Sequence, residues 1–249
     1  MENPTRKPTV VLVHGAFAES ASWSGVIAEL QKRGYTTIAT PNPLRSVDGD
    51  AATVSRVVAA VDGPVVLVGH SYGGQVISNV QDSGNINALV YVAAFAPDEG
   101  ESGAALAGKY PGSTLEQALA QPIPLEGGDV DLWIRHDKFH AQFAADMSEA
   151  EAALMAATQR HAAGSALNGP SGEPLWKAIP SYFIYGDADA CLPPQGLGWM
   201  AERADSKKTV VIPGASHVVM ASNPAAVANL IDEAAQSADT LIHIEGIQP

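Results

Sequence analysis

The sequence contains few cysteines, few basic residues and no long apolar run, and each shortage excludes a class of protein. One cysteine, Cys191, occurs among 249 residues, which excludes an internal disulfide and favours a reducing compartment. Lys and Arg number 14 against 27 Asp and Glu, and the net charge of −13 argues against nucleic acid or an anionic membrane as partner. The sequence lacks any run of about 18 apolar residues, so we expect no transmembrane helix. The polar residues 1–9 do not resemble a signal peptide, so we expect a cytoplasmic protein.

Motifs for nucleotides and metals are missing as well. The glycines of residues 69–74 do not have the spacing G-x-G-x-x-G, and no G-K-[ST] occurs anywhere. No tyrosine has a lysine four residues later, which disfavours a short-chain dehydrogenase. His136 and His140 have the spacing of a zinc helix, but Asp137 stands where H-E-x-x-H needs glutamate. We therefore predict no cofactor and no metal.

The most informative stretch is residues 65–80, VVLVGHSYGGQVISNV. Its first four residues form an apolar run that predicts a strand buried on both faces. G-x-S-x-G follows with Ser71 at its centre, and the apolar residues after it have helical spacing. Strand, G-x-S-x-G and helix in this order predict a nucleophile elbow, in which a strained turn exposes the serine hydroxyl at a helix N-terminus.

Strands and amphipathic helices alternate over residues 1–97. Apolar runs predict buried strands at 10–13, 36–39, 65–68 and 88–93, and further strands at 181–185 and 209–212. Asp50 is predicted to cap the helix before the third strand. Short connections between alternating strands and helices predict a doubly wound, mostly parallel sheet of about six strands. Reactive groups in such sheets collect at the carboxyl ends of the strands.

Residues 98–179 interrupt this alternation, so we expect residues 1–97 and 180–249 to form the core. The interruption is too long for a plain loop, and we predict a helical lid inserted after the fourth strand. Its helices are predicted at 114–120, 137–146 and 148–161, the last with a Ser148–Glu151 capping box. The large apolar residues of the insertion are predicted to form the lid's own core: Trp133, Phe139, Phe143, Leu154, Met155 and Trp176. Residues 237–249 receive no assignment.

Ser71 is a weak nucleophile that needs a base and an orienting acid. His217 follows a strand end in a Gly/Ser loop and comes last, which matches the order Ser, acid, His. His14 and His70 also follow strands, but each is predicted to shape its own turn. The remaining histidines belong to the lid or the tail: His136, His140, His161 and His243.

Three carboxylates compete for the role of acid. Asp189 and Asp187 both follow the strand at 181–185, and Asp98 follows the strand before the lid. Asp189 is preferred because it lies beyond the turn that Gly186 opens, whereas Asp187 is predicted to cap that turn. Asp98 stays open as an alternative.

An oxyanion formed on a carbonyl needs backbone donors already aimed at it. The N–H of Tyr72, directly after the nucleophile, is one predicted donor. The second is the N–H of Ala16 in the loop after the first strand, with Phe17 as the alternative. A pocket walled by Phe17, Tyr72 and Trp23 suits an apolar acyl or alcohol group.

These motifs give the chain a resemblance to a known family. It resembles the cofactor-independent serine esterases of the α/β-hydrolase fold, close to the branch of plant methylesterases and hydroxynitrile lyases and their bacterial relatives. VLVHGAF, VGHSYGG, YVAAFAPDEG, GDADACLPP and GASHVVMASNP carry the resemblance, which covers residues 9–236. It implies a Ser71–Asp189–His217 triad with Ala16 and Tyr72 as oxyanion donors. The lyases have a lysine directly after the catalytic histidine, and Val218 at that position argues against cyanohydrin chemistry.

The sequence therefore predicts a serine hydrolase that cleaves a small or medium carboxylic ester, or a lactone, as its small-molecule partner. Two alternatives stay open: a non-catalytic ligand-binding or receptor protein on the same fold, and a cofactor-free perhydrolase, lyase or oxygenase. The sequence does not decide the oligomeric state, for which a homodimer is one option.

Overall fold

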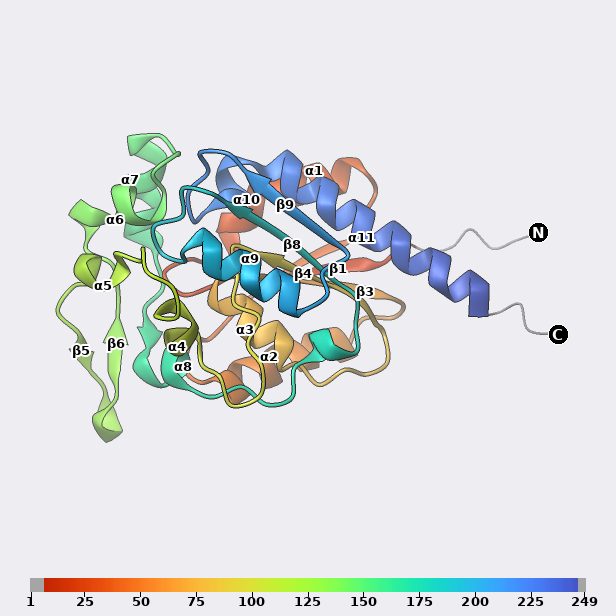
Figure 1. The fold of residues 1–249 in the computed structure, drawn as a ribbon, viewed down its shortest axis with the longest axis horizontal. Coiled ribbons are helices and arrows are strands. Elements are labelled where there is room, and N and C mark those ends of the chain that lie inside the picture. The colour runs from red at the N-terminus through yellow and green to blue at the C-terminus, as the bar shows by residue number, and fades with distance from the viewer. Residues whose placement is uncertain (1–6, 246–249) are drawn as a thin grey trace.

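A six-stranded parallel sheet forms the centre of the molecule (Figure 1). The structure is a computed structural model that describes residues 7–245, with side chains as far as residue 237. The strands lie in the order β2-β1-β3-β4-β8-β9. Their bounds are β1 Thr9–Val13, β2 Thr37–Thr40, β3 Val65–His70, β4 Ile86–Val92, β8 Ser181–Gly186 and β9 Lys208–Ile212. The predicted sheet is thus confirmed, with boundaries shifted by a few residues.

Burial explains why these runs become central strands. Every residue of β1, β3 and β8 is buried, as expected of parallel strands covered by helices on both faces. α1 (Ser24–Lys32) and α11 (Pro224–Glu245) pack against each other on one face, and α2 (Val47–Ala59) and α3 (Tyr72–Ser78) pack together on the other (Figure 1). Because all six strands are parallel, their carboxyl ends form one edge, where the site is built.

The insertion between β4 and β8 contains helices, as predicted, but it also contains short strands that the prediction lacked. A small antiparallel sheet joins β5 (Ile123–Pro124), β6 (Val130–Leu132) and β7 (Ala162–Ala163). Strands this short show no periodicity in a sequence. The helices of the insertion are short too: α4 Gly103–Ala107, α5 Leu115–Ala118, α6 His136–Phe143, α7 Glu149–Thr158 and α8 Gly164–Asn168. The Ser148–Glu151 capping box at the start of α7 is confirmed.

Of the apolar residues predicted to form the core of the lid, Phe139 and Phe143 are fully buried. Leu154 on α7 is 66% exposed, so for this residue the prediction is wrong. The remaining helices follow β8 and β9: α9 (Pro194–Arg203) packs on β8, and α10 (Val219–Ser222) precedes α11. No helix among residues 7–245 is both long enough and apolar enough to cross a bilayer.

Two further expectations need correction. Ser46, not Asp50, caps α2, since the Ser46 hydroxyl accepts the Gly49 N–H at 3.2 Å. α11 runs on to Glu245, through part of the tail that received no assignment; residues 246–249 lie outside the described residues.

Asp50 is instead a buried partner of the elbow helix. Its carboxylate accepts the Tyr72 hydroxyl at 2.8 Å and the Arg45 N–H at 3.1 Å. Burial raises the pKa of the Asp50 carboxyl and that of the Tyr72 hydroxyl. The pair therefore ties the start of α3 to α2.

We expect Tyr72→Phe to lower the free energy of unfolding by about 1–3 kcal/mol, because it leaves a buried carboxylate without one of its donors. Urea unfolding at neutral pH measures the loss. Tyr110→Phe is the matched control, since the Tyr110 hydroxyl has no hydrogen-bond partner among the described residues. Equal unfolding midpoints for the two variants would show that the Asp50–Tyr72 bond contributes nothing.

Candidate active site

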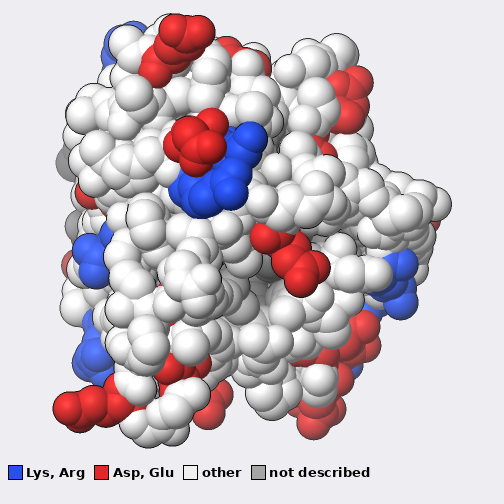
Figure 2. Space-filling view, turned by 90° about the vertical axis from the view of Figure 1, so that its left-hand side faces the viewer, with Lys and Arg blue, Asp and Glu red and all other residues white. Residues whose placement is uncertain are grey.

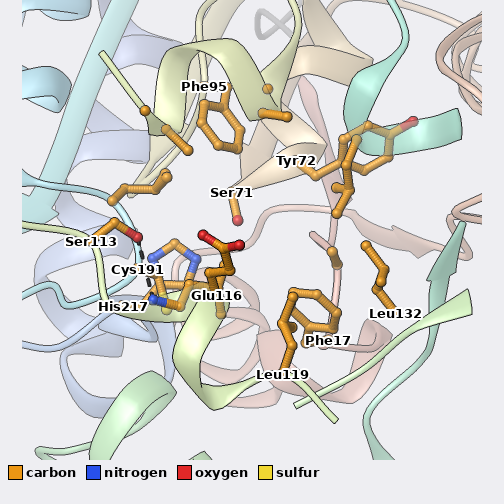
Figure 3. Close-up of a pocket in the computed structure, with 18 of the residues that line it drawn as sticks. Phe17, Ser71, Tyr72, Phe95, Ser113, Glu116, Leu119, Leu132, Cys191 and His217 are labelled. Carbon is orange, nitrogen blue, oxygen red and sulfur yellow. Dashed lines mark hydrogen bonds between the residues drawn. The ribbon is translucent and has the colours of Figure 1, made fainter. Parts of the chain in front are cut away.

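Ser71 lies on a sharp turn between β3 and α3. Its backbone has φ 52° and ψ −123°, a left-handed conformation that costs about 1–3 kcal/mol in a non-glycine residue. Strand and helix approach so closely that a Cβ at Gly69 would lie 2.5 Å from the Gly73 carbonyl oxygen. The turn directs the Ser71 side chain into a cavity (Figure 3). The predicted elbow geometry is confirmed.

His217 and Asp189 meet in the loops after β9 and β8. His217 Nδ1 lies 2.7 Å from Asp189 Oδ2. The other carboxylate oxygen, Oδ1, accepts the N–H groups of Cys191 at 2.8 Å and Leu192 at 2.9 Å. Because a carboxylate only accepts hydrogen bonds, Nδ1 carries the imidazole proton and Nε2 presents a lone pair. The loops are closely packed here, for a Cβ at Gly186 would lie 2.0 Å from the Ala215 carbonyl oxygen.

Ser71 and His217 line the same cavity, and no hydrogen bond joins their side chains in the described part of the chain. Both residues are nearly buried, with exposed fractions of 7% and 1%, so water reaches them mainly through the cavity. A substrate carbonyl entering that space would meet the hydroxyl and the imidazole together. Hydrogen bonds of this kind are often long before a substrate binds.

The other two candidate acids lie elsewhere. Asp98 forms an ion pair with Lys177, at 2.6 Å, and is not among the cavity residues. Its hydrogen bond to Lys177 holds the pKa of the Asp98 carboxyl below its usual value. Asp187 accepts the Gly214 N–H of the loop after β9 at 2.6 Å, so it joins two loops, and the prediction that it caps its own turn is wrong. The structure thus places Asp189 alone of the three against His217.

The loop after β1 supplies one free backbone donor beside Ser71. The N–H of Phe17 donates to the Arg160 carbonyl at 3.1 Å, which removes Phe17 from the candidate oxyanion donors. The Ala16 N–H has no acceptor among the described residues. Tyr72 is the first residue of α3, so its N–H has no acceptor within that helix. The two preferred donors are therefore the ones left available.

His14 and His70 behave as predicted for histidines that shape turns. His14 Nδ1–H donates to the Gly15 carbonyl at 2.9 Å, and its Nε2 accepts the Asn42 N–H at 3.1 Å. His70 Nε2–H donates to the His217 carbonyl at 3.1 Å, and the two imidazole rings lie 4.8 Å apart. Burial lowers the pKa of His14 to about 4 and that of His70 well below its usual value. Both rings are therefore neutral near pH 7, and His70 adds no second positive charge beside His217.

This burial predicts a loss of stability in acid. Between an unfolded pKa of 6.5 and a folded pKa of about 4, the unfolded chain binds a proton at His14 that the folded chain does not. The contribution of neutral, buried His14 to the free energy of unfolding is therefore complete above about pH 6.5, and it is lost as the pH falls towards about 4. We expect a loss of about 3 kcal/mol from His14, with more from His70.

Urea unfolding at about pH 7 and about pH 5 checks this expectation. His14→Asn should flatten the pH dependence, whereas the control His136→Asn, at an exposed position, should leave it unchanged. The same slope in both variants would contradict the assignment to His14.

The cavity above Ser71 has a volume of about 430 Å³ and mostly apolar walls. Residues from the core and the insertion line it, including Phe17, Tyr72, Phe95, Leu119 and Leu132 (Figure 3). Phe143 lines it as well. Trp23 does not line it, which corrects the expectation for this residue. Its side chain is fully buried and packs edge-on against His70, with ring centroids 6.4 Å apart.

Among the described residues, one thiol and one carboxylate line the cavity, those of Cys191 and Glu116, and the sequence analysis placed neither of them there. Cys191 lies two positions after Asp189, and Glu116 projects from α5 (Figure 3). The Cys191 Sγ lies within 4.8 Å of ligand atoms of Asp189 and His217, a grouping that could hold a metal ion. However, both Asp189 oxygens already accept hydrogen bonds, and burial raises the pKa of the Cys191 thiol. The position of Cys191 two residues after Asp189 could have predicted that it lies near the site. No sequence feature predicted that Glu116 lines the cavity.

A parallel sheet with a serine at a strand–turn–helix elbow and a buried His–carboxylate pair at the neighbouring strand ends defines the α/β-hydrolase fold. The chain belongs to the alpha/beta hydrolase family, whose model matches residues 10–230. Among solved structures it is similar to polyneuridine aldehyde esterase, with a TM-score of 0.79 and 19% identity, over 92% of this chain and 99% of the other. The expected fold and the resemblance to this class of hydrolases are thereby confirmed.

Curated relatives are similar over part of the chain. A carbendazim hydrolyzing esterase of Nocardioides sp. (strain SG-4G) is 33% identical over 146 residues, 47% of this chain. A probable hydrolase of Phoma sp. (strain ATCC 20986 / MF5453) is 32% identical over 112 residues, 39% of this chain. The matched parts span 60% and 46% of these two relatives' own lengths.

Proposed function

We propose that the protein is a serine hydrolase that cleaves small or medium carboxylic esters, or lactones, through an acyl-enzyme on Ser71. The observation that carries the proposal is the buried His217–Asp189 pair, whose imidazole lines the same cavity as a serine on a strained elbow. The names of the family and of its relatives, two of them esterases, support hydrolysis of an ester bond.

In the proposed reaction, Ser71 Oγ attacks the substrate carbonyl while His217 Nε2 takes the hydroxyl proton. The negative charge that develops on the carbonyl oxygen is stabilised by the N–H groups of Ala16 and Tyr72, neither of which has an acceptor among the described residues. The protonated imidazole then gives its proton to the leaving alcohol. Next, His217 Nε2 takes a proton from water as the water oxygen attacks the acyl carbon. The imidazolium then returns that proton to Ser71 Oγ as the acyl–Oγ bond breaks and the acid is released.

Asp189 keeps the imidazole in the tautomer that this sequence needs. With Nδ1–H donated to Asp189 Oδ2, only Nε2 can accept a proton, and it is the nitrogen available to Ser71. The carboxylate also stabilises the imidazolium formed during the reaction. Its two backbone hydrogen bonds fix the carboxylate orientation, so the imidazole is held before substrate arrives.

Cavity size and lining support an apolar substrate of modest size. Sites for small molecules commonly have volumes of about 300–1,000 Å³, apolar walls and a few polar groups. The cavity above Ser71 fits the lower part of this range, at about 430 Å³. Phenyl and short alkyl esters are therefore the substrates to test first.

Hydrolysis of p-nitrophenyl acetate and butyrate tests the proposal. We expect an initial burst of p-nitrophenolate stoichiometric with protein, because acyl transfer to Ser71 precedes attack by water. A p-nitrophenyl phosphonate should transfer its phosphonyl group to Ser71 Oγ with loss of p-nitrophenolate, and mass spectrometry locates the adduct. An adduct on another residue would overturn the nucleophile assignment. Tight binding of such esters without any turnover would favour a ligand-binding protein.

A further inference from the structure

Glu116 is the one Asp, Glu, Lys or Arg among the described residues that line the cavity above Ser71. It lies on α5 in the insertion, across the cavity from the nucleophile elbow. In the close-up its carboxylate points into the space between Ser71, His217 and Phe17 (Figure 3). A bound substrate therefore meets this charge as well as the catalytic groups.

The Glu116 carboxylate has no hydrogen bond or ion pair with any described residue. Two of the cationic side chains on nearby elements are engaged with other groups, and Lys138 on α6 forms no ion pair with Glu116. Arg135, which precedes the neighbouring helix α6, pairs with Asp137 at 3.4 Å. Lys109, which follows α4, lies over the ring of Trp199, 4.3 Å from its centroid. Neither of these two cations therefore pairs with Glu116.

Glu116 is itself exposed, but it faces a cavity whose walls are mostly apolar. The cavity walls are mostly apolar, and fields in such clefts are screened less than on an open surface. The whole chain carries a net charge of −13, which adds a negative background. On the face that carries the insertion, acidic side chains border the hollow at the centre of the view (Figure 2). A cation entering the cavity gains a partner there, and an anion is repelled.

We propose that Glu116 sets substrate preference, selecting esters that carry a quaternary or protonated amine over uncharged and anionic esters of the same shape. The inference rests on the proposed ester hydrolysis and adds the substrate class. Glu116 takes no part in the chemistry itself. It binds the charged end of the substrate, so its effect falls mainly on KM rather than on kcat.

Matched ester pairs test this preference. In the first pair the alcohol is choline or its carbon isostere, in which a quaternary carbon replaces the nitrogen, both as butyrates. In the second, the same replacement is made in the acyl chain of an ethyl ester. We expect kcat/KM to favour the cationic member of at least one pair by about tenfold. Glu116→Gln should bring that ratio close to equality, mainly by raising KM for the cationic ester.

Glu126→Gln is the matched control, because Glu126 lies in the same insertion, is exposed and does not line the cavity. It changes the net charge equally and should keep the wild-type ratio. Raising the ionic strength should lower the ratio in wild type and in this control, but not in Glu116→Gln. A ratio that survives Glu116→Gln, or equal rates within both pairs in wild type, would overturn the inference.

Calorimetry separates this inference from the proposed function. Choline should bind wild type more tightly than its carbon isostere does, and Glu116→Gln should abolish the difference. If no ester is hydrolysed but this difference is found, ester hydrolysis is wrong and the role of Glu116 stands. If the uncharged esters are hydrolysed but no binding difference is found, ester hydrolysis stands and the role of Glu116 is wrong.

Discussion

Ser71→Ala is expected to lower kcat for p-nitrophenyl esters about a million-fold, to a rate set by binding and the oxyanion donors alone. The reason is that Ser71 carries the only serine or threonine hydroxyl of residues 69–74, and its side chain faces both the cavity and the region of His217. Alanine keeps the Cβ that the turn already accommodates, so the free energy of unfolding should change little. The change should therefore appear in kcat and not in the urea midpoint.

Ser113→Ala is the matched control, since Ser113 lines the same cavity but belongs to the insertion. We expect its kcat to stay within about threefold of wild type. Phosphonate labelling should be lost in Ser71→Ala and kept in Ser113→Ala. Comparable rates for wild type and Ser71→Ala would remove the acyl-enzyme from the mechanism.

The sheet could be predicted from the sequence because its strands are buried on both faces. β1 and β3 are unbroken or nearly unbroken apolar runs, a pattern that depends only on the residues of the strand itself. β6 has three residues and gains its place only by pairing with distant segments, so no local pattern reveals it. The prediction that Asp50 caps α2 was wrong for a related reason. Its carboxylate accepts a buried hydrogen bond from the distant Tyr72, and Ser46 caps the helix instead.

The candidate site also combines residues that the local sequence could predict with residues whose positions depend on long-range contacts. Ser71, Asp189 and His217 each follow a strand of the sheet, so topology alone brings them to one edge. Whether the Trp23 side chain lines the cavity or lies in the core depends on the direction in which its helical turn faces. In the structure the side chain packs against His70. Glu116 depends on how the insertion folds over the sheet, which long-range contacts decide. The residues proposed to carry the chemistry could therefore be predicted, while those that line the substrate side of the cavity could not.

Asp189→Asn is expected to lower kcat about ten-thousand-fold with little change in fold. The amide oxygen can still accept the N–H groups of Cys191 and Leu192, which the carboxylate Oδ1 accepts now. The amide nitrogen would then face His217 Nδ1, where it can only donate. His217 must therefore carry its proton on Nε2, the wrong nitrogen for accepting a proton from Ser71.

Asp98→Asn is the control that separates the two candidate acids. Asp98 is partly exposed and paired with Lys177, outside the cavity, so this variant should keep kcat within about twofold of wild type. Steady-state kinetics on p-nitrophenyl butyrate and a urea unfolding curve for each variant provide the comparison. A large loss of kcat at position 98 with none at 189 would assign the acid to Asp98. Losses at neither position would show that the imidazole keeps its tautomer without a carboxylate, and the role proposed for Asp189 would be wrong.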